Sequence, residues 1–424
     1  MEHNEASTSD SHLRSAYIWN TAGSMLNAFQ SVLMLMVITR ACDLVTAGVF
    51  TLAYANANLF LTMGSYGMRN FEASDVRPRF GFRAYGRSRV VTGLAMVVCS
   101  WLWLAWSATV NAYPLDKILA VALMTLMKGT DTVEDLFDGS FQQAGRLDIA
   151  GRQMTLRVGS TIVVFCGAII LTRSLVLATA IGFVWTLGFL LVSLAIIRWR
   201  YHLPLTHAEA PEKSALRLLH ECLPLFLSSF LLFYVGNAPK YAIDGALSDA
   251  DQAIYGFIAM PVFVVGLLAQ FVYMPMVQPV SAMWDRGDSK GFVRAFMRQV
   301  GVILAITAVC VLGAAIAGPP VLGWLYHTDL NGWRIELCVL VLGGGFLALA
   351  QLFTMGITIV RRQHLLTPGY VVVAIAAWAT SMPLVSAYGI RGASMCYIAC
   401  MVVLASWFGT LFGWCLCLGP GNAE

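Results

Sequence analysis

The stretch that decides the fold is residues 19–60, WNTAGSMLNAFQSVLMLMVITRACDLVTAGVFTLAYANANLF. It holds two long apolar runs, separated only by the short polar interruption at residues 40–43. A bilayer core about 30 Å thick needs about 20 mostly apolar residues per helix, and each run is long enough. The stretch therefore predicts two membrane-spanning helices joined by a tight turn.

The rest of the chain repeats this pattern. Hydrophobic residues make up 58% of its 424 residues and charged residues only 12%, whereas about 25% of a soluble domain is charged. We therefore predict an all-α integral membrane protein with about twelve transmembrane helices. They are expected near residues 15–40, 44–66, 90–110, 117–138, 157–172, 175–197, 221–244, 252–276, 299–319, 335–359, 369–387 and 392–418, the fifth being the shortest. The first residues lack the basic start of a signal peptide, so the first span is expected to be retained.

The basic residues predict the orientation. With the N-terminus inside, twenty Lys and Arg residues fall on the cytoplasmic side and five on the outer side, and such a bias puts both termini in the cytoplasm. The polar stretch 199–220 divides the chain into an N-lobe (15–198) and a C-lobe (221–418), flanked by cytoplasmic tails at 1–14 and 419–424. The end of this linker, SALRLLHE (214–221), is expected to form a short amphipathic helix at the interface.

Two sequence echoes indicate that the lobes are repeats. RAYGR (83–87) follows the second span, and RAFMR (294–298) follows the eighth. AGVF (47–50) and QAIY (252–255) lie at the starts of the same two spans. Six spans in each half would give two lobes of the same orientation, as in transporters built from parallel repeats.

Ionisable residues within spans are functional hypotheses because they are costly in a bilayer. In the fourth span, LMKGTDTVEDLFDGS (126–140), Lys128, Asp131, Asp135 and Asp138 share one helical face, with Glu134 beside it. Two interpretations stay open. Lys128 and Asp131 couple an ion or gate transport, or they form a local pair while Asp135 and Asp138 snorkel at a cytoplasmic helix end.

The seventh span, YVGNAPKYAIDG (234–245), carries Asn237, Pro239, Lys240 and Asp244. Proline removes one helical hydrogen bond and is tolerated in spans that meet polar partners. Lys240 and Asp244 are four residues apart and can neutralise each other. Alternatively, Lys240 is a cation that faces an anionic substrate, with Asp244 in a gating role.

The first two spans carry polar side chains as well. Asn20, Asn27 and Gln30 form one stripe, Arg40 ends the first span, and Asn56 lies in the second. Such residues can be packing contacts between helices or can line a polar cavity.

The sequence gives no indication of an enzyme, a cofactor, a metal site or a nucleic-acid partner. The ten cysteines lie mostly in apolar spans, where a thiol behaves as a small hydrophobic group. There is no phosphate-binding glycine loop and no HExxH. A membrane polymerase or ligase of polysaccharide assembly, the alternative from another class, would need larger outer loops than this chain offers.

Taken together, these features resemble the multidrug/oligosaccharidyl-lipid/polysaccharide exporter superfamily. Residues 19–60 resemble the opening of bacterial polysaccharide flippases, and NAPKYAIDGALSDADQAIYGFIAMPVFVVGLLAQFVYMPM (237–276) resembles the start of their second half. The resemblance implies a V-shaped pair of six-helix lobes in the bacterial plasma membrane. It also implies a cargo of oligosaccharide linked through pyrophosphate to a polyprenol, which moves from the inner to the outer leaflet for surface polysaccharide synthesis.

The implied partners are the lipid-linked oligosaccharide, membrane lipids and polysaccharide assembly enzymes. For the pyrophosphate, the resemblance implies the cations Lys240, Arg40 and Arg69, although Arg69 also fits a topology anchor. For the sugars it implies polar and aromatic side chains, namely Asn20, Asn27, Gln30, Tyr54, Asn56, Asn237 and Tyr241. A cation-coupled multidrug exporter of the same superfamily is the alternative, with Asp131 as its membrane carboxylate.

Overall fold

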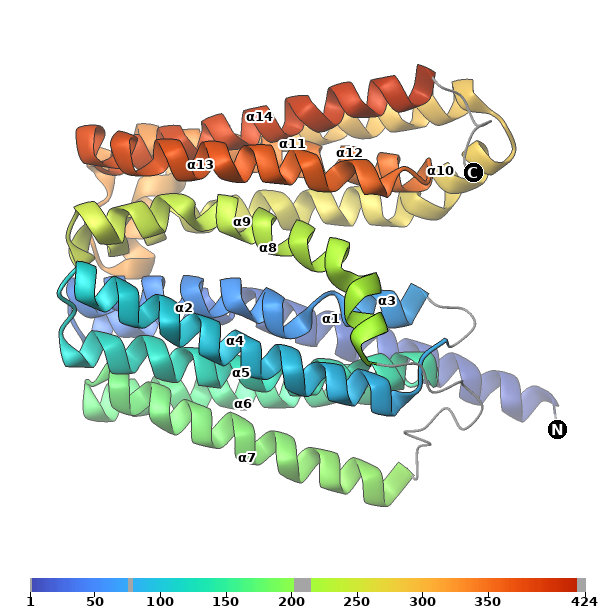
Figure 1. Ribbon diagram of the computed structural model, residues 1–424, viewed down its shortest axis with the longest axis horizontal. Coiled ribbons are helices and arrows are strands. Elements are labelled where there is room, and N and C mark those ends of the chain that lie inside the picture. Colours follow the sequence, from blue (N-terminus) through green and yellow to red (C-terminus); the bar gives the residue numbers. More distant parts are fainter. Residues whose placement is uncertain (1, 75–78, 202–214, 418–424) are drawn as a thin grey trace. The chain divides into compact units, whose positions relative to one another are not determined.

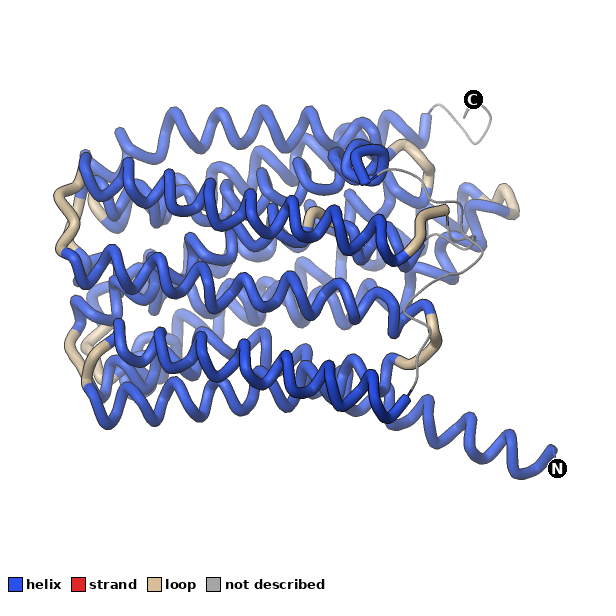
Figure 2. Tube along the Cα trace, turned by 60° about the horizontal axis from the view of Figure 1, so that its bottom comes forward, coloured by secondary structure: helices blue, strands red, loops and turns tan. Residues whose placement is uncertain are grey.

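The computed structural model describes residues 2–74, 79–201 and 215–417, and in these ranges the chain forms helices joined by short loops, without strands. Figure 2 shows the loops at the helix ends. The twelve long helices are α1 (Glu2–Ala41), α2 (Leu44–Ser65), α4 (Phe82–Val110), α5 (Leu115–Gln143), α6 (Leu147–Thr172), α7 (Leu175–Tyr201), α8 (Ala215–Ala246), α9 (Asp249–Tyr273), α11 (Ser289–Tyr326), α12 (Arg334–Ile359), α13 (Leu366–Tyr388) and α14 (Ile390–Cys417). Short helices are α3 (Met68–Ser74), α10 (Val277–Asp285), η1 (Met274–Met276), η2 (Asn331–Trp333) and η3 (Gln363–Leu365).

The all-α membrane class is confirmed, and each predicted span has its long helix. Eleven helices are long and apolar enough to cross a membrane. The exception is α5, which is 29 residues long but carries the charged run of the fourth predicted span. Among the described long helices, α5 is therefore the one whose charged side chains must be covered by other helices and not by lipid.

Several predicted spans are shorter than the helices that contain them. The fifth span was placed at 157–172, whereas α6 has 26 residues, and the ninth was placed at 299–319, whereas α11 has 38. Residues 2–14 of the predicted tail form the start of α1, and residues 215–221 (ALRLLHE) form the first turns of α8 instead of a separate helix. Most of the predicted linker (202–214) and the tail 419–424 lie outside the described residues.

Side-chain caps fix where helices begin. The Asp43 carboxylate accepts the Thr46 N–H at 2.8 Å and starts α2 directly after α1. The hydrogen bonds from Thr46 hold the pKa of Asp43 below its usual value. At the matching place in the second half, Ser248 and Asp251 form a capping box that starts α9.

The chain divides into two compact units, residues 1–230 and 231–424, with the boundary inside α8. In the first unit, α5 contacts α2, α4, α6 and α7, and α1 packs along α6. These helices run lengthwise beside one another (Figure 1). In the second unit, α12 contacts α9, α11 and α14, and α13 packs on α14. α5 and α12 are each the fourth long helix of their half, and the contacts of α5 with α2, α4 and α7 recur as the contacts of α12 with α9, α11 and α14, which supports the predicted duplication. The packing of α1 along α6 has no such counterpart between α8 and α13.

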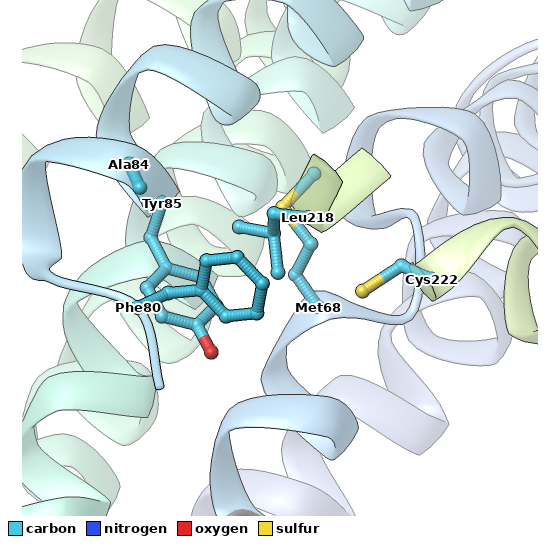
Figure 3. Close-up of a cluster of buried hydrophobic side chains, with 6 residues drawn as sticks. All are labelled: Met68, Phe80, Ala84, Tyr85, Leu218 and Cys222. Carbon is cyan, nitrogen blue, oxygen red and sulfur yellow. The ribbon is translucent and has the colours of Figure 1, made fainter. Parts of the chain in front are cut away.

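The beginning of α8 is packed into the first unit by an apolar cluster. Leu218 and Cys222 meet Met68 of α3 and Tyr85 of α4, together with Phe80 (Figure 3). Cys222 and Leu218 are fully buried. This cluster fixes the first turns of α8 against the segment that links α2 to α4.

Gly151 of α6 sets how closely α1 approaches α6. A Cβ at Gly151 would lie 2.5 Å from the backbone nitrogen of Asn20, so any side chain would force the two backbones apart. Gly167, on the same helix, has nothing within 4 Å of the corresponding position.

We expect Gly151→Ala to lower the thermal unfolding temperature in detergent. Gly167→Ala should leave it unchanged or raise it, because alanine stabilises a helix by about 0.5–1 kcal/mol over glycine. Equal effects of the two substitutions would contradict this packing.

Candidate functional site

A buried charge network surrounds α5 in the first unit. Its predicted polar face holds Lys128, Asp131, Glu134, Asp135 and Asp138, and these side chains meet basic residues from three other helices. A charge at the centre of a bilayer costs about 2.5–3.5 kcal/mol on insertion scales. The ion pairs and the neighbouring helices therefore explain how α5 can cross the membrane.

Lys128 lies at one end of the network. Its Nζ donates to Gln30 Oε1 of α1 at 2.8 Å and to Asp131 Oδ2 at 3.0 Å. It also lies 5.2 Å from the centre of the Tyr54 ring of α2, whose hydroxyl donates to the same Gln30 oxygen at 3.3 Å. The predicted local pair of Lys128 and Asp131 is therefore present, but it is one part of a larger cluster.

Arg157 of α6 bridges two carboxylates of α5. Its Nη2 donates to Asp131 Oδ1 at 2.8 Å and to Glu134, and its Nη1 donates to Thr186 Oγ1 of α7 at 2.8 Å. The predicted span 157–172 placed Arg157 at its very start, whereas Arg157 lies well inside α6 and is buried. The charged residues before it made the apolar run appear to begin at 157, whereas the helix begins ten residues earlier.

Arg89, which lies just before the predicted span 90–110, is within α4 and is also buried. It forms an ion pair with Asp135, and its Nη1 donates to the carbonyls of Gly64 at 2.9 Å and Ser65 at 2.6 Å. These are the last carbonyls of α2, which have no partner within their own helix. Arg89 therefore caps α2 and neutralises α5 at once.

Arg69 of α3 joins the network near the end of α5. Its Nη1 lies 3.2 Å from Asp138 Oδ2 and 3.7 Å from Asp135 Oδ1. Asp138 is only 3% exposed, so the interpretation that it snorkels to solvent was wrong. Short helix α3 turns Arg69 back toward α5 instead of leaving it free at the membrane surface.

The remaining predicted residues of the first unit are separated from one another. Asn27 and Arg40 are exposed and Asn20 is partly buried, while Gln30 turns inward to Lys128. Asn56 is buried and donates to Ser100 Oγ at 3.1 Å, a packing contact between α2 and α4. The stripe therefore contributes one member, Gln30, to the charge network.

The second unit holds the predicted residues of α8. Asn237 donates to the Phe233 carbonyl at 2.9 Å, and the Tyr241 ring stacks on Tyr234 with centroids 6.2 Å apart. Lys240 is partly buried, and no described residue forms a hydrogen bond or ion pair with it. The alternative that Lys240 and Asp244 neutralise each other is therefore wrong, because no ion pair joins them in the described part of the chain.

The network residues missed by sequence reasoning are Arg89 and Arg157. An available signal was the number of acids on the α5 face, which exceeds what Lys128 can neutralise. Basic residues near the ends of neighbouring spans were the natural partners. Without knowing which helices pack on α5, the sequence could not say which of them turn inward.

Arg157 provides a test of the network. We expect Arg157→Met to lower the free energy of unfolding by about 3–5 kcal/mol, because it leaves Glu134 and part of Asp131 buried without a counter-charge. Arg217→Ala is the control: its side chain is 61% exposed and pairs with Glu221 at the surface, so the loss should be below about 1 kcal/mol. Thermal or denaturant unfolding in detergent measures both, and similar losses would contradict the assignment.

Comparison with known proteins gives the fold of the whole chain. No protein family profile matches the sequence, and no curated protein matches it. Twenty-four chains of solved structures match. One is an inward-facing multidrug resistance MATE family transporter of the MOP superfamily, with TM-score 0.68 and 11% identity over 93% of this chain and 95% of that chain.

Two further matches are similar in extent. The Vibrio cholerae MATE transporter VcmN in its bent form has TM-score 0.59 and 11% identity, covering 97% of this chain and 98% of that one. A MOP superfamily transporter from Pyrococcus furiosus, described as having a binding pocket of reverse polarity, has TM-score 0.57 and 12% identity, covering 97% and 96%. The chain therefore has the fold of the MATE transporters of the MOP superfamily.

Proposed function

We propose that this protein is a flippase, which moves polyprenyl-pyrophosphate-linked oligosaccharides from the inner to the outer leaflet of a bacterial plasma membrane for surface polysaccharide synthesis. The fold supports transport, and the sequence resemblance of residues 19–60 and 237–276 to polysaccharide flippases supports the cargo. The single observation that carries the choice of cargo is Lys240, a cation that no described residue pairs with.

Lys240 is suited to an anionic headgroup. It lies six residues before the end of α8, about 9 Å along the helix axis, and has no counter-ion among the described residues. An ammonium group within a span is costly unless something pairs with it. A pyrophosphate would supply the missing charge through charge-assisted hydrogen bonds.

The neighbouring side chains on α8 suit sugars. Tyr234, Asn237 and Tyr241 are three and four residues apart, so they follow one face of the helix next to Lys240. Tyrosine rings offer apolar faces, and the Asn237 amide offers both a donor and an acceptor. A phosphate-binding cation beside such a face matches the two chemical parts of the cargo.

The second candidate is a cation-coupled multidrug exporter, in line with the description of one structural neighbour as a multidrug resistance transporter. It would need an acidic group for an organic cation, and Asp131 is the predicted one. Asp131 already pairs with Lys128 at 3.0 Å and with Arg157 at 2.8 Å. This double pairing favours the flippase, because a drug cation would have to displace two resident cations.

Reconstitution tests the proposal. Liposomes with purified protein and a fluorescent polyprenyl-pyrophosphate oligosaccharide should show protein-dependent exchange between leaflets. Lys240→Ala should slow exchange by about 10- to 100-fold, because a hydrogen bond to a charged group is worth about 1.5–3 kcal/mol. Lys240→Arg, the matched control, retains the charge and should keep most of the rate.

Either of two results would contradict the flippase. Wild-type protein that exchanges no native cargo would overturn it directly. Growth protection against drugs that is abolished by Asp131→Asn, without any effect of Lys240→Ala, would favour the exporter.

A further inference from the structure

One face of α7 packs inside the first unit and the other face is exposed. The helix packs on α5 and α6 and runs beside them along one edge of the unit (Figure 1). On the packed face, a Cβ at Gly182 would lie 3.1 Å from Met127 Sδ of α5, and Thr186 accepts a hydrogen bond from Arg157 of α6. Because α7 is apolar and long enough to cross a membrane, its other face meets lipid.

A groove of about 720 Å³ follows the exposed face. The described lining comes from α7 and forms two neighbouring rows along the helix. Ile181, Trp185, Gly188 and Val192 form one row, and Phe189, Ser193 and Ile196 form the other. The hydroxyl of Ser193 donates to the Leu190 carbonyl of its own helix at 3.0 Å, so the lining presents an apolar surface to an occupant.

Gly188 and Trp185 shape the middle of the groove. A Cβ at Gly188 would meet nothing within 4 Å, so the groove is open above this residue. The Trp185 side chain is 43% exposed, and its Nε1 donates to Ser160 Oγ of α6 at 3.0 Å. This hydrogen bond fixes the indole ring as a wall beside the open space.

Both rows lead to residues suited to the membrane surface. Trp199 comes two turns after Val192 and continues the first row, and Arg200 comes two turns after Ser193 and continues the second. Trp199 is 78% exposed and Arg200 is exposed as well. No described residue forms a hydrogen bond or ion pair with Arg200, and residues 175–201 contain no acidic residue.

This combination suits a lipid with an anionic headgroup. An apolar groove alone selects no lipid, because lipid tails are as apolar as the side chains around them. A guanidinium group at its end adds selection through charge-assisted hydrogen bonds to a phosphate, and tryptophan favours the headgroup level. One leaflet of the bilayer core is about 15 Å deep, or about ten residues of helix. A chain that starts at Ile196 therefore passes Gly188 and ends near Trp185.

We propose that this groove binds one anionic phospholipid, with its phosphate on Arg200 and one acyl chain along Gly188. The site does not depend on the proposed cargo. A second copy of the protein fits the groove less well than a lipid does. In a symmetric pair within one membrane, the two α7 helices would bring Arg200 of each copy together, and like charges repel.

Native mass spectrometry of the purified full-length protein in detergent tests the site. The probes are phosphatidylglycerol and phosphatidylcholine with the same acyl chains, added in equal amounts. Wild type should retain one phosphatidylglycerol in preference to phosphatidylcholine. Arg200→Gln should weaken this retention about fivefold, the loss expected for one basic residue near an anionic lipid surface. Arg198→Gln is the matched control and should change it little, because Arg198 lies two residues away on the opposite side of the helix.

A second pair of variants tests the chain. Gly188→Phe fills the groove and should abolish the retention of phosphatidylglycerol. Gly167→Phe should leave it unchanged, because Gly167 of α6 also has open space at its Cβ but lies outside the groove. Circular dichroism checks that each variant is folded.

Equal retention of the two phospholipids by wild type, or equal losses in Arg200→Gln and Arg198→Gln, would overturn the proposal in favour of general surface charge. A lipid-free dimer that Gly188→Phe converts to a monomer would assign the groove to a second copy instead. Preferential retention of polyprenyl phosphate would assign it to the tail of the cargo, and would also overturn the proposal. Lys240→Ala should retain phosphatidylglycerol as wild type does, so a failure of cargo exchange with intact retention counts against the flippase alone.

Discussion

The neutralisation of α5 inside the first unit is the constraint on which the rest of that unit depends. A helix with five ionisable residues between positions 128 and 138 cannot face lipid, so other helices must cover it and must bring basic groups with them. Arg89, Arg157 and Arg69 come from α4, α6 and α3, and each fixes its helix to α5 through a directional contact. In this unit, ion pairs thus hold neighbouring helices together, as tight apolar packing does in other helical bundles.

In the second unit, close backbone contact and not charge holds the helices around the central helix. Its central helix, α12, takes the place of α5 but carries glycines at 343–345, against which Tyr397, Val262 and Thr307 pack closely. Small residues let helices approach one another in membranes where burial from water gives no driving force. The contacts around the fourth long helix are therefore alike in the two units, but they rest on charge around α5 and on close backbone approach around α12.

This division explains how far sequence reasoning could go. The order of the long helices follows mostly from apolar length, which is a local property, and the structure confirms a long helix for each predicted span, eleven of them apolar enough to cross a membrane. Positions 89 and 157 show the limit: an arginine at the edge of an apolar run has the same local sequence whether it lies in a cytoplasmic loop or points into a bundle. Its role depends on the neighbouring helix, and helix pairing cannot be read from hydropathy. Lys128 and Asp131 could be found because both partners lie on one helix, three residues apart.

Of the three cations that the resemblance implies for the pyrophosphate, Lys240, Arg40 and Arg69, two differ clearly in their contacts. Arg69 already shares Asp135 and Asp138, so a phosphate that approached it would have to displace carboxylates that neutralise α5. Breaking a buried ion pair by removing one partner typically costs about 3–5 kcal/mol, which a single phosphate contact would not recover. Lys240 carries no such commitment among the described residues. We therefore expect an anionic headgroup to bind at Lys240 of α8, while the ion pairs of the α5 network stay intact.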